Sequence, residues 1–178
     1  APIRRLQDAG AHVASLHPMF GPSVVLLREC DVVICDTGDV PATVCIKVSP
    51  RIDGWIREAY FGQLLDRHPR TIRVFDAFPL ARQDGQLLYC LALEYARHGA
   101  LSAYLHRTGK GWMERRARRE IAGILEVLGK LHRGQTLHRD LTPMNVFVCD
   151  GPFLKLGDFG IARPQSDRRG ITARTMNP

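Results

Sequence analysis

The order of apolar and polar residues divides the chain into a strand-rich first part and a helix-rich second part. Five short runs rich in apolar and β-branched residues predict strands. These runs are Val24–Leu27, Asp31–Cys35, Ala42–Val48, Ile72–Phe78 and Leu87–Glu94. Between the third and fourth runs, apolar residues at helical spacing predict one helix over residues 54–65. Turn residues fit this prediction, because Thr37 and Gly38 follow the second run and Asp84 and Gly85 precede the fifth.

The second part of the chain has the periodicity of helices. Residues 101–131 are predicted to be helical, with one apolar stripe that faces a core. The stripe consists of Ile121, Ile124, Leu125, Leu128 and Leu131. The runs Val146–Cys149 and Phe153–Leu156 then predict short strands. A sheet with a single helix, followed by long helices and short hairpins, predicts an α+β fold.

This organisation predicts three parts within a chain of 178 residues, a length that suits one domain. Three prolines interrupt residues 1–23, so we expect an N-terminal extension with at most a short helix over residues 6–16. Residues 24–95 form the strand-rich part, and residues 96–178 form the helix-rich part.

Composition narrows the class of protein and its compartment. Hydrophobic residues make up 45% of the chain and charged residues 24%, as in ordinary globular domains. No apolar run approaches the ~20 residues that cross a bilayer, so we expect no membrane segment. None of the five cysteines forms a C-x-x-C pair, which favours free thiols in a reducing compartment and a cytoplasmic location.

The formal net charge of +7 comes mainly from arginine. Four of the 25 basic residues are lysines, and 25 − 4 leaves 21 arginines. Most are scattered, so we expect no specific binding of nucleic acid. One dense cluster, Arg115, Arg116, Arg118 and Arg119, lies on a predicted helix. A solvated helix face is the favoured interpretation, and attraction of an acidic substrate or partner is the alternative.

Two motifs carry candidate chemistry. His138–Asn145 reads HRDLTPMN, and Asp158-Phe159-Gly160 follows after twelve residues. Two carboxylates and an amide at this spacing suit phosphoryl transfer, in which one acid orients a hydroxyl and the others hold Mg²⁺. The two motifs together resemble those of eukaryotic-like Ser/Thr protein kinases, and Leu154–Arg163 (LKLGDFGIAR) is similar to the same family's pattern.

The resemblance implies a two-lobed kinase-like fold, in which residues 24–95 form a first lobe built on an antiparallel sheet and residues 96–178 form part of a second, helical lobe. It also implies roles for particular residues. Asp140 would be the catalytic base, and Asn145 and Asp158 would bind Mg²⁺. Val44–Lys47 (VCIK) resembles the family's V-A-I-K, which implies that Lys47 holds the phosphates of ATP. The expected partner of Lys47 is Glu58, and the eleven-residue gap between them requires a compact loop.

Further expectations concern the hinge, the histidines and the turn after Asp158. Leu88–Tyr95 (LYCLALEY) is similar to the family's hinge strand, so the backbones of Glu94 and Ala96 would meet the adenine. Leu93 would then close the back of the pocket. His138 and His132 are expected to be structural. Gly160 is expected to let the backbone turn sharply after Asp158.

The chain also departs from the family's pattern. The loop expected to be rich in glycine reads Arg28-Glu29-Cys30, so either this loop binds phosphate poorly or Arg28 does part of that work as a cation. Thr142 stands where most of these kinases have lysine. The sequence ends at Pro178, before the family's later helices, and we interpret it as an excerpt of a longer protein. Arg139 implies control by a phosphorylated residue, with Thr172, Thr175 and Ser166 as candidates.

Several functions therefore stay open. The favoured one is a protein Ser/Thr kinase that uses ATP and Mg²⁺ on a protein substrate. The alternative is a pseudokinase or nucleotide-binding regulatory module, motivated by the missing glycines and by Thr142. A small-molecule kinase of related fold usually lacks the HRD arginine and the DFG phenylalanine, and this chain has both. A basic nucleic-acid binder would not need Asp140.

Overall fold

The computed structural model describes residues 30–36, 41–49, 51–81, 85, 87–151 and 153–166. Several features expected from the sequence lie outside these residues. They are the extension 1–23, the strand 24–27, Arg28, the turn after Asp36, and Thr172 and Thr175.

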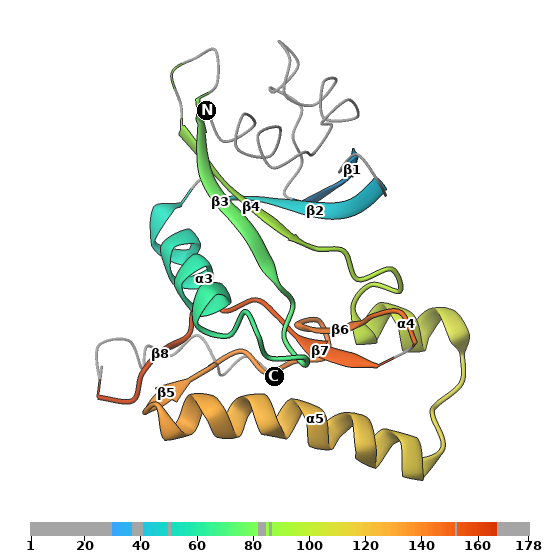
Figure 1. The fold of residues 1–178 in the computed structure, drawn as a ribbon. Coiled ribbons are helices and arrows are strands. Elements are labelled where there is room, and N and C mark those ends of the chain that lie inside the picture. The colour runs from blue at the N-terminus through green and yellow to red at the C-terminus, as the bar shows by residue number, and fades with distance from the viewer. Residues whose placement is uncertain are drawn as a thin grey trace, which may run out of the picture.

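A four-stranded antiparallel sheet forms the upper lobe (Figure 1). Its strands are β1 (Cys30–Asp36), β2 (Pro41–Ser49), β3 (Val74–Ala81) and β4 (Leu87–Glu94), in the order β1-β2-β4-β3. Four of the five predicted strands are thus present. The run predicted over Ile72–Phe78 begins later, at Val74, because the Ile72 N–H donates to the Leu156 carbonyl at 2.9 Å and so joins the lower lobe.

One helix, α3 (Ile52–Leu64), packs against this sheet, as the apolar spacing predicted. Phe61 and Gly62 are buried on its inner side. The approach is close at Gly62, where an added Cβ would lie 2.1 Å from Cγ2 of Val74. The Trp55 indole N–H donates to the Cys90 carbonyl at 2.8 Å and ties the first turn of α3 to β4.

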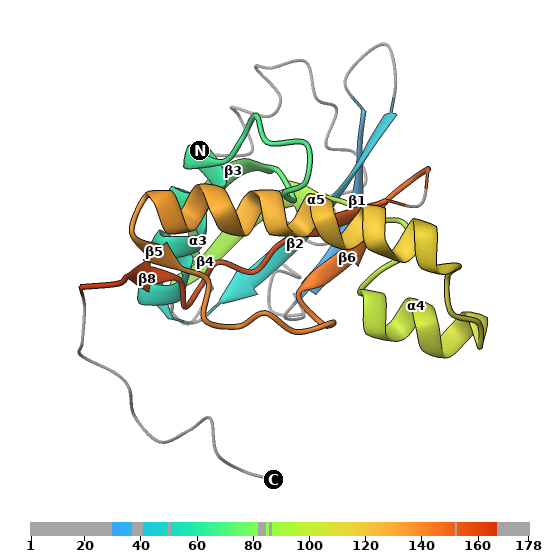
Figure 2. The same ribbon diagram turned by 90° about the horizontal axis from the view of Figure 1, so that it is seen from below.

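Two helices occupy the predicted helical region. They are α4 (Leu101–Thr108) and α5 (Glu114–Arg133), and α5 runs beneath the other elements (Figure 2). Gly109 ends α4 with a left-handed φ of 59°, and its N–H donates to the Leu105 carbonyl. The local turn chemistry of glycine therefore overrides the helical periodicity on either side.

The predicted apolar stripe of α5 is partly wrong. Ile124 and Leu131 are buried, but Ile121 and Leu125 are 54% and 57% exposed. The buried line instead runs through Glu120, Ile124, Val127 and Leu131, the side of α5 that faces β7. Periodicity alone could not distinguish these two overlapping lines, because residues three and four apart share a face.

Short paired strands complete the lower lobe. They are β5 (Thr136–Leu137), β6 (Val146–Val148), β7 (Leu154–Leu156) and β8 (Arg163–Pro164), and β5 pairs with β8 and β6 with β7. Within the described residues, one apolar cluster lies beneath the upper sheet around Ile72 and Leu91, and another lies between α5 and the hairpins. The predicted α+β class is confirmed.

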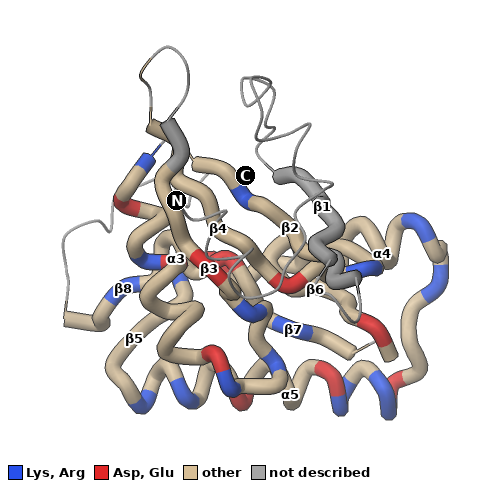
Figure 3. The backbone as a smooth tube through the Cα atoms, turned by 45° about the horizontal axis from the view of Figure 1, so that its top comes forward, with Lys and Arg blue, Asp and Glu red and all other residues tan. Residues whose placement is uncertain are grey.

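The arginine cluster and the cysteines follow their predicted patterns where they are described. Basic residues recur along α5 (Figure 3). Arg115, Arg118 and Arg119 are exposed, and Arg116 lies over the Trp112 ring at 4.0 Å. Among the described side chains, Cys45, Cys90 and Cys149 are free thiols. Burial raises the pKa of Cys90 and of Cys149 to about 11. None of the helices within the described residues is long and apolar enough to cross a membrane.

Candidate functional site

A cavity of about 470 Å³ lies between the upper sheet and the β6–β7 hairpin. Apolar side chains make up most of its walls: Ile72, Val74, Leu93, Ala96 and Phe147. Lys47, Glu58 and Asp158 also line it, as does the backbone that continues from β4 through Tyr95. An apolar pocket with a few convergent charges is the usual form of a small-molecule site.

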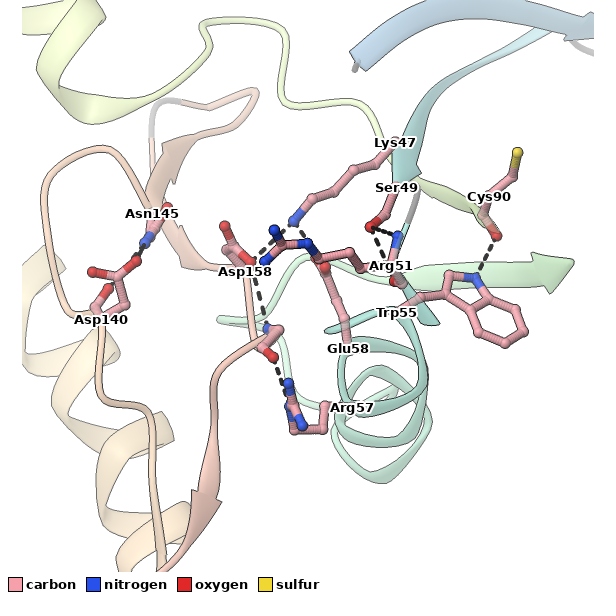
Figure 4. Close-up of polar contacts among 12 residues, drawn as sticks. Lys47, Ser49, Arg51, Trp55, Arg57, Glu58, Cys90, Asp140, Asn145 and Asp158 are labelled. Carbon is pink, nitrogen blue, oxygen red and sulfur yellow. Dashed lines mark hydrogen bonds and ion pairs between the residues drawn. The ribbon is translucent and has the colours of Figure 1, made fainter. Parts of the chain in front are cut away.

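Lys47 lies between two carboxylates in this cavity (Figure 4). Its Nζ is 2.8 Å from Oε2 of Glu58 and 3.0 Å from Oδ1 of Asp158. The alternation of β2 explains this orientation, because Val44, Ile46 and Val48 are buried on the opposite face. The predicted contact with Glu58 is therefore present.

The loop between β2 and α3 is as compact as the short gap requires. The Ser49 hydroxyl donates to the Arg51 carbonyl at 3.0 Å, and Ser49 Oγ accepts the Arg51 N–H at 3.1 Å. This local turn starts α3 directly after β2. Glu58 therefore lies on the second turn of α3, within reach of Lys47.

Charge and burial oppose each other at this triad. Burial on its own lowers the pKa of Lys47, but the carboxylates of Glu58 and Asp158 outweigh it and raise that pKa above its usual value. Burial raises the pKa of Glu58, and the Lys47 ammonium opposes that rise. One cation between two acids leaves a local excess of negative charge, which a bound cation would neutralise.

Asp140 and Asn145 are held together in the loop that follows β5. The Asn145 side-chain amide donates to the Asp140 carbonyl at 3.0 Å and to Asp140 Oδ2 at 2.8 Å (Figure 4). The Asn145 N–H donates to Thr142, and the Asn145 carbonyl accepts the Gly157 N–H, both at 3.0 Å. The last bond connects this loop to the residue before Asp158.

Gly160 lies in the turn that follows Asp158, as expected, because the Ala162 N–H donates to the Phe159 carbonyl at 3.0 Å across Gly160 and Ile161. The sequence did not predict that Asp158 itself adopts a left-handed backbone. Asp158 has a φ of 55°, in the left-handed region that costs an ordinary residue about 1–2 kcal/mol. Contacts on both sides hold it there. Lys47 contacts its carboxylate, and Arg57 Nε donates to the Gly160 carbonyl at 2.7 Å. Strain at such a position is typical of functional sites.

His138 is structural, as expected. It is 2% exposed, its Nε2 lies 3.0 Å from the Gly157 carbonyl, and its ring meets Phe159 edge-on at 5.0 Å. Burial lowers the pKa of His138, although the Gly157 carbonyl opposes this effect. A neutral ring that donates from Nε2 can accept the Asp140 N–H at Nδ1, where the separation is 3.4 Å.

Sequence reasoning missed two buried ion pairs near the site. Lys155 of β7 contacts both oxygens of Glu94, and Arg70 contacts Glu120 of α5. Lys155 could have been found, because it interrupts an apolar strand as Lys47 does. Its partner could not, because Glu94 lies 61 residues away.

The residues present fit Mg²⁺ held together with phosphates. No group of three or more acidic, His or Cys side chains in the described part of the chain forms a metal cage. Mg²⁺ needs no such cage, since it commonly binds through one or two carboxylates plus phosphate oxygens. Asp158 offers a carboxylate, and Asn145 uses its amide N–H groups on Asp140, which leaves its carbonyl oxygen available to a metal.

Comparison with known proteins supports one family. Residues 34–177 match the family model for the protein kinase domain. The chain is similar to serine/threonine-protein kinase ATG1a of Arabidopsis thaliana, 34% identical over 122 residues, or 65% of this chain and 18% of the relative.

Two further relatives agree. The mitosis inducer protein kinase cdr1 of Schizosaccharomyces pombe is 35% identical over 132 residues, which cover 71% of this chain and 20% of cdr1. An Aurora kinase of Yarrowia lipolytica is 30% identical over 146 residues, 79% of this chain and 38% of the relative. The chain thus spans well under half the length of each of these relatives.

Proposed function

The chain belongs to the protein kinase family, and from this premise we propose that it forms the ATP site and catalytic loop of a protein Ser/Thr kinase. The proposed reaction moves the γ-phosphoryl group of ATP to a serine or threonine hydroxyl of a protein substrate. The observation that carries the proposal is Lys47, which joins Glu58 and Asp158 in one cavity.

We propose that the adenine lies against the backbone of residues 94–96, between the apolar walls. The Glu94 N–H already donates to the Arg73 carbonyl at 2.9 Å. The carbonyl of Glu94 is therefore the group expected to meet the adenine amino group, together with the backbone of Ala96. Leu93 is buried at the end of β4, in keeping with a residue that closes the pocket.

The phosphates are proposed to extend from the adenine toward Lys47. A phosphate oxygen would replace Asp158 as a partner of Lys47, and Glu58 would keep the ammonium in place. Mg²⁺ held by Asp158 and Asn145 would supply charge neutralisation at the transferring group. Asp158 would then pair with Mg²⁺ in place of the Lys47 ammonium.

Asp140 is proposed as the base that orients the substrate hydroxyl and accepts its proton. The Asn145 amide bonds one carboxylate oxygen and the carbonyl of Asp140, which fixes the acid in one orientation. The other oxygen can then face a hydroxyl.

Control by phosphorylation remains part of the proposal. Arg139, whose φ is 70°, directly precedes Asp140, and a phosphorylated residue of the following segment could pair with it. Ser166 is exposed. The cytoplasmic location and the absence of specific nucleic-acid binding stay predictions.

The test is Asp140→Asn in the full-length protein. Phosphoryl transfer from radiolabelled ATP to a generic basic protein should be lost, whereas the Kd for Mg-ATP should stay within about twofold. Asp150→Asn is the matched control, because the Asp150 side chain is 69% exposed. Unchanged turnover in Asp140→Asn contradicts the proposal. Nucleotide binding without transfer by the unsubstituted protein would favour the binding-module alternative.

A further inference from the structure

A buried ion pair links β4 to β7 beside the cavity. Lys155, in the middle of β7, is 8% exposed, and its Nζ lies 2.6 Å and 2.7 Å from the two carboxylate oxygens of Glu94. Glu94 is the last residue of β4 and lines the cavity. This bidentate contact fixes the separation of β4 and β7, which are far apart in the sequence.

Both partners are held by further contacts. Oε2 of Glu94 also accepts the Arg73 N–H at 3.2 Å, and the Lys155 ammonium lies 5.5 Å from the centre of the Phe153 ring. Next to Lys155, the Leu156 N–H donates to the Arg70 carbonyl at 2.8 Å. The pair is therefore part of a rigid connection, and loss of either partner would leave a buried charge without compensation.

The two segments that this pair connects have different tasks in the proposed function. Glu94 begins the backbone stretch proposed to meet the adenine. Lys155 lies three residues before Asp158, and Gly157, the residue between Leu156 and Asp158, bonds to Asn145. The pair thus connects the adenine end of the site to the segment that carries Asp158 and that is hydrogen-bonded to Asn145.

We propose that Lys155 is a positioning residue that sets the distance between the adenine end and the metal end of the nucleotide site. Lys155 contacts neither the nucleotide nor the substrate, and it acts through Glu94 and the backbone of β7. The inference rests on the proposed function. A ligand that uses both ends of the site depends on this distance, whereas a ligand that uses one end does not.

The competing explanation is a general structural role. A pair that only stabilises the fold would affect every ligand equally, or none, and would lower the unfolding temperature. The ratio of the Kd for adenosine to the Kd for Mg-ADP separates the two roles, because adenosine occupies the adenine end alone.

The experiment measures both dissociation constants by calorimetry in the full-length protein, for the unsubstituted chain, Lys155→Met and Glu94→Gln. The adenosine-to-Mg-ADP ratio is expected to fall about tenfold in both variants. In steady-state kinetics, the KM for ATP should change more than kcat. Lys155→Arg, which keeps the charge, should restore most of the ratio, and Lys110→Met, at an exposed lysine, should leave it unchanged.

Two other outcomes would each overturn a distinct claim, and the second variant covers a failure to fold. If both variants bind adenosine and Mg-ADP with an unaltered ratio, the pair is structural only and the inference is wrong. If Lys155→Met does not fold, the ratio in Glu94→Gln decides alone. If the unsubstituted protein binds no nucleotide, the proposed function itself fails, and this inference fails with it.

Discussion

Lys47 and Glu120 both lie in ion pairs inside the molecule, yet their surroundings differ. Lys47 lines a cavity, its side chain is 27% exposed, and it faces two acids alone. Glu120 is enclosed, with a side chain 2% exposed, and it accepts hydrogen bonds from Arg70, Arg119 and the Leu154 N–H. The Lys47 cluster has one cation for two carboxylates and borders a cavity. At Glu120, both carboxylate oxygens accept hydrogen bonds from groups within the fold.

The difference separates a site for chemistry from a support for the fold. A ligand can exchange with one of the two acids around Lys47, because the cavity admits it and the net charge favours a cation. Nothing can exchange at Glu120 without leaving a buried charge unpaired. The Glu120 cluster instead joins α5 to the start of β7 and to the segment before β3. Four substitutions or conditions test this contrast.

Lys47→Met should have the largest effect on activity. Loss of the cation removes the group proposed to hold the phosphates, so phosphoryl transfer should fall by at least about 100-fold. The side chain of Asp158 is 38% exposed, but Glu58 is buried and would lose its cation, so the unfolding temperature should also fall. Lys130→Met, at an exposed lysine of α5, is the control for kinase assays and calorimetry. If Lys47→Met retained its activity, the cavity would not be the site of phosphoryl transfer.

Glu120→Gln should act on stability and spare the site. Weaker bonds to Arg70 and Arg119 should cost about 2 kcal/mol of unfolding free energy, which corresponds to roughly 6 °C in a domain of this size. The Kd for Mg-ATP should stay within about twofold. Glu114→Gln is the matched control, since the Glu114 side chain is 76% exposed and pairs with Arg118 on the surface. If Glu120→Gln lost as much nucleotide affinity as Lys47→Met, Glu120 would not be a support for the fold alone, and the contrast with Lys47 would be wrong.

Gly157→Ala should disturb the cavity wall directly. An added Cβ would lie 2.9 Å from Cε2 of Phe147 and 3.2 Å from Cγ1 of Ile72, two residues that line the cavity. Overpacking of about 1 kcal/mol should raise the KM for ATP several-fold. Gly111→Ala, where nothing lies within 4 Å of the added methyl group, should have no such effect. Equal KM values in the two variants would show that the nucleotide lies elsewhere.

The smallest effect concerns pH. Burial on its own raises the pKa of Glu120, but hydrogen bonds from the Leu154 N–H, Arg70 and Arg119 hold that pKa below its usual value of 4.5. The unfolded chain thus binds this proton more readily than the folded protein. The carboxylate contributes stability above pH 4.5, and that contribution is lost as the pH falls further. Urea unfolding at pH 7, 5 and 3.5 should show a smaller gap between the unsubstituted protein and Glu120→Gln at the lowest pH. A constant gap contradicts this account.

Several predictions from the sequence hold because they depend on short-range patterns. Strands β2 and β4 and helix α3 lie within two residues of their expected bounds. The apolar stripe of α5 was wrong in part, because two overlapping lines of residues share the same helical spacing. The left-handed φ of Asp158 was not predicted, because contacts from Lys47 and Arg57, which are distant in the sequence, hold the backbone there.

The sequence by itself determined which residue types stand at the motif positions. It also brought Asp140 and Asn145 together, since Asn145 follows Asp140 by five positions in one loop. Only the tertiary structure decided which cation pairs with which acid. Lys47 meets Asp158 across 111 residues, and Lys155 meets Glu94 across 61. Such pairs depend on strand register, helix placement and burial, which no local pattern encodes, because a buried charge takes the partner that the packing brings within reach.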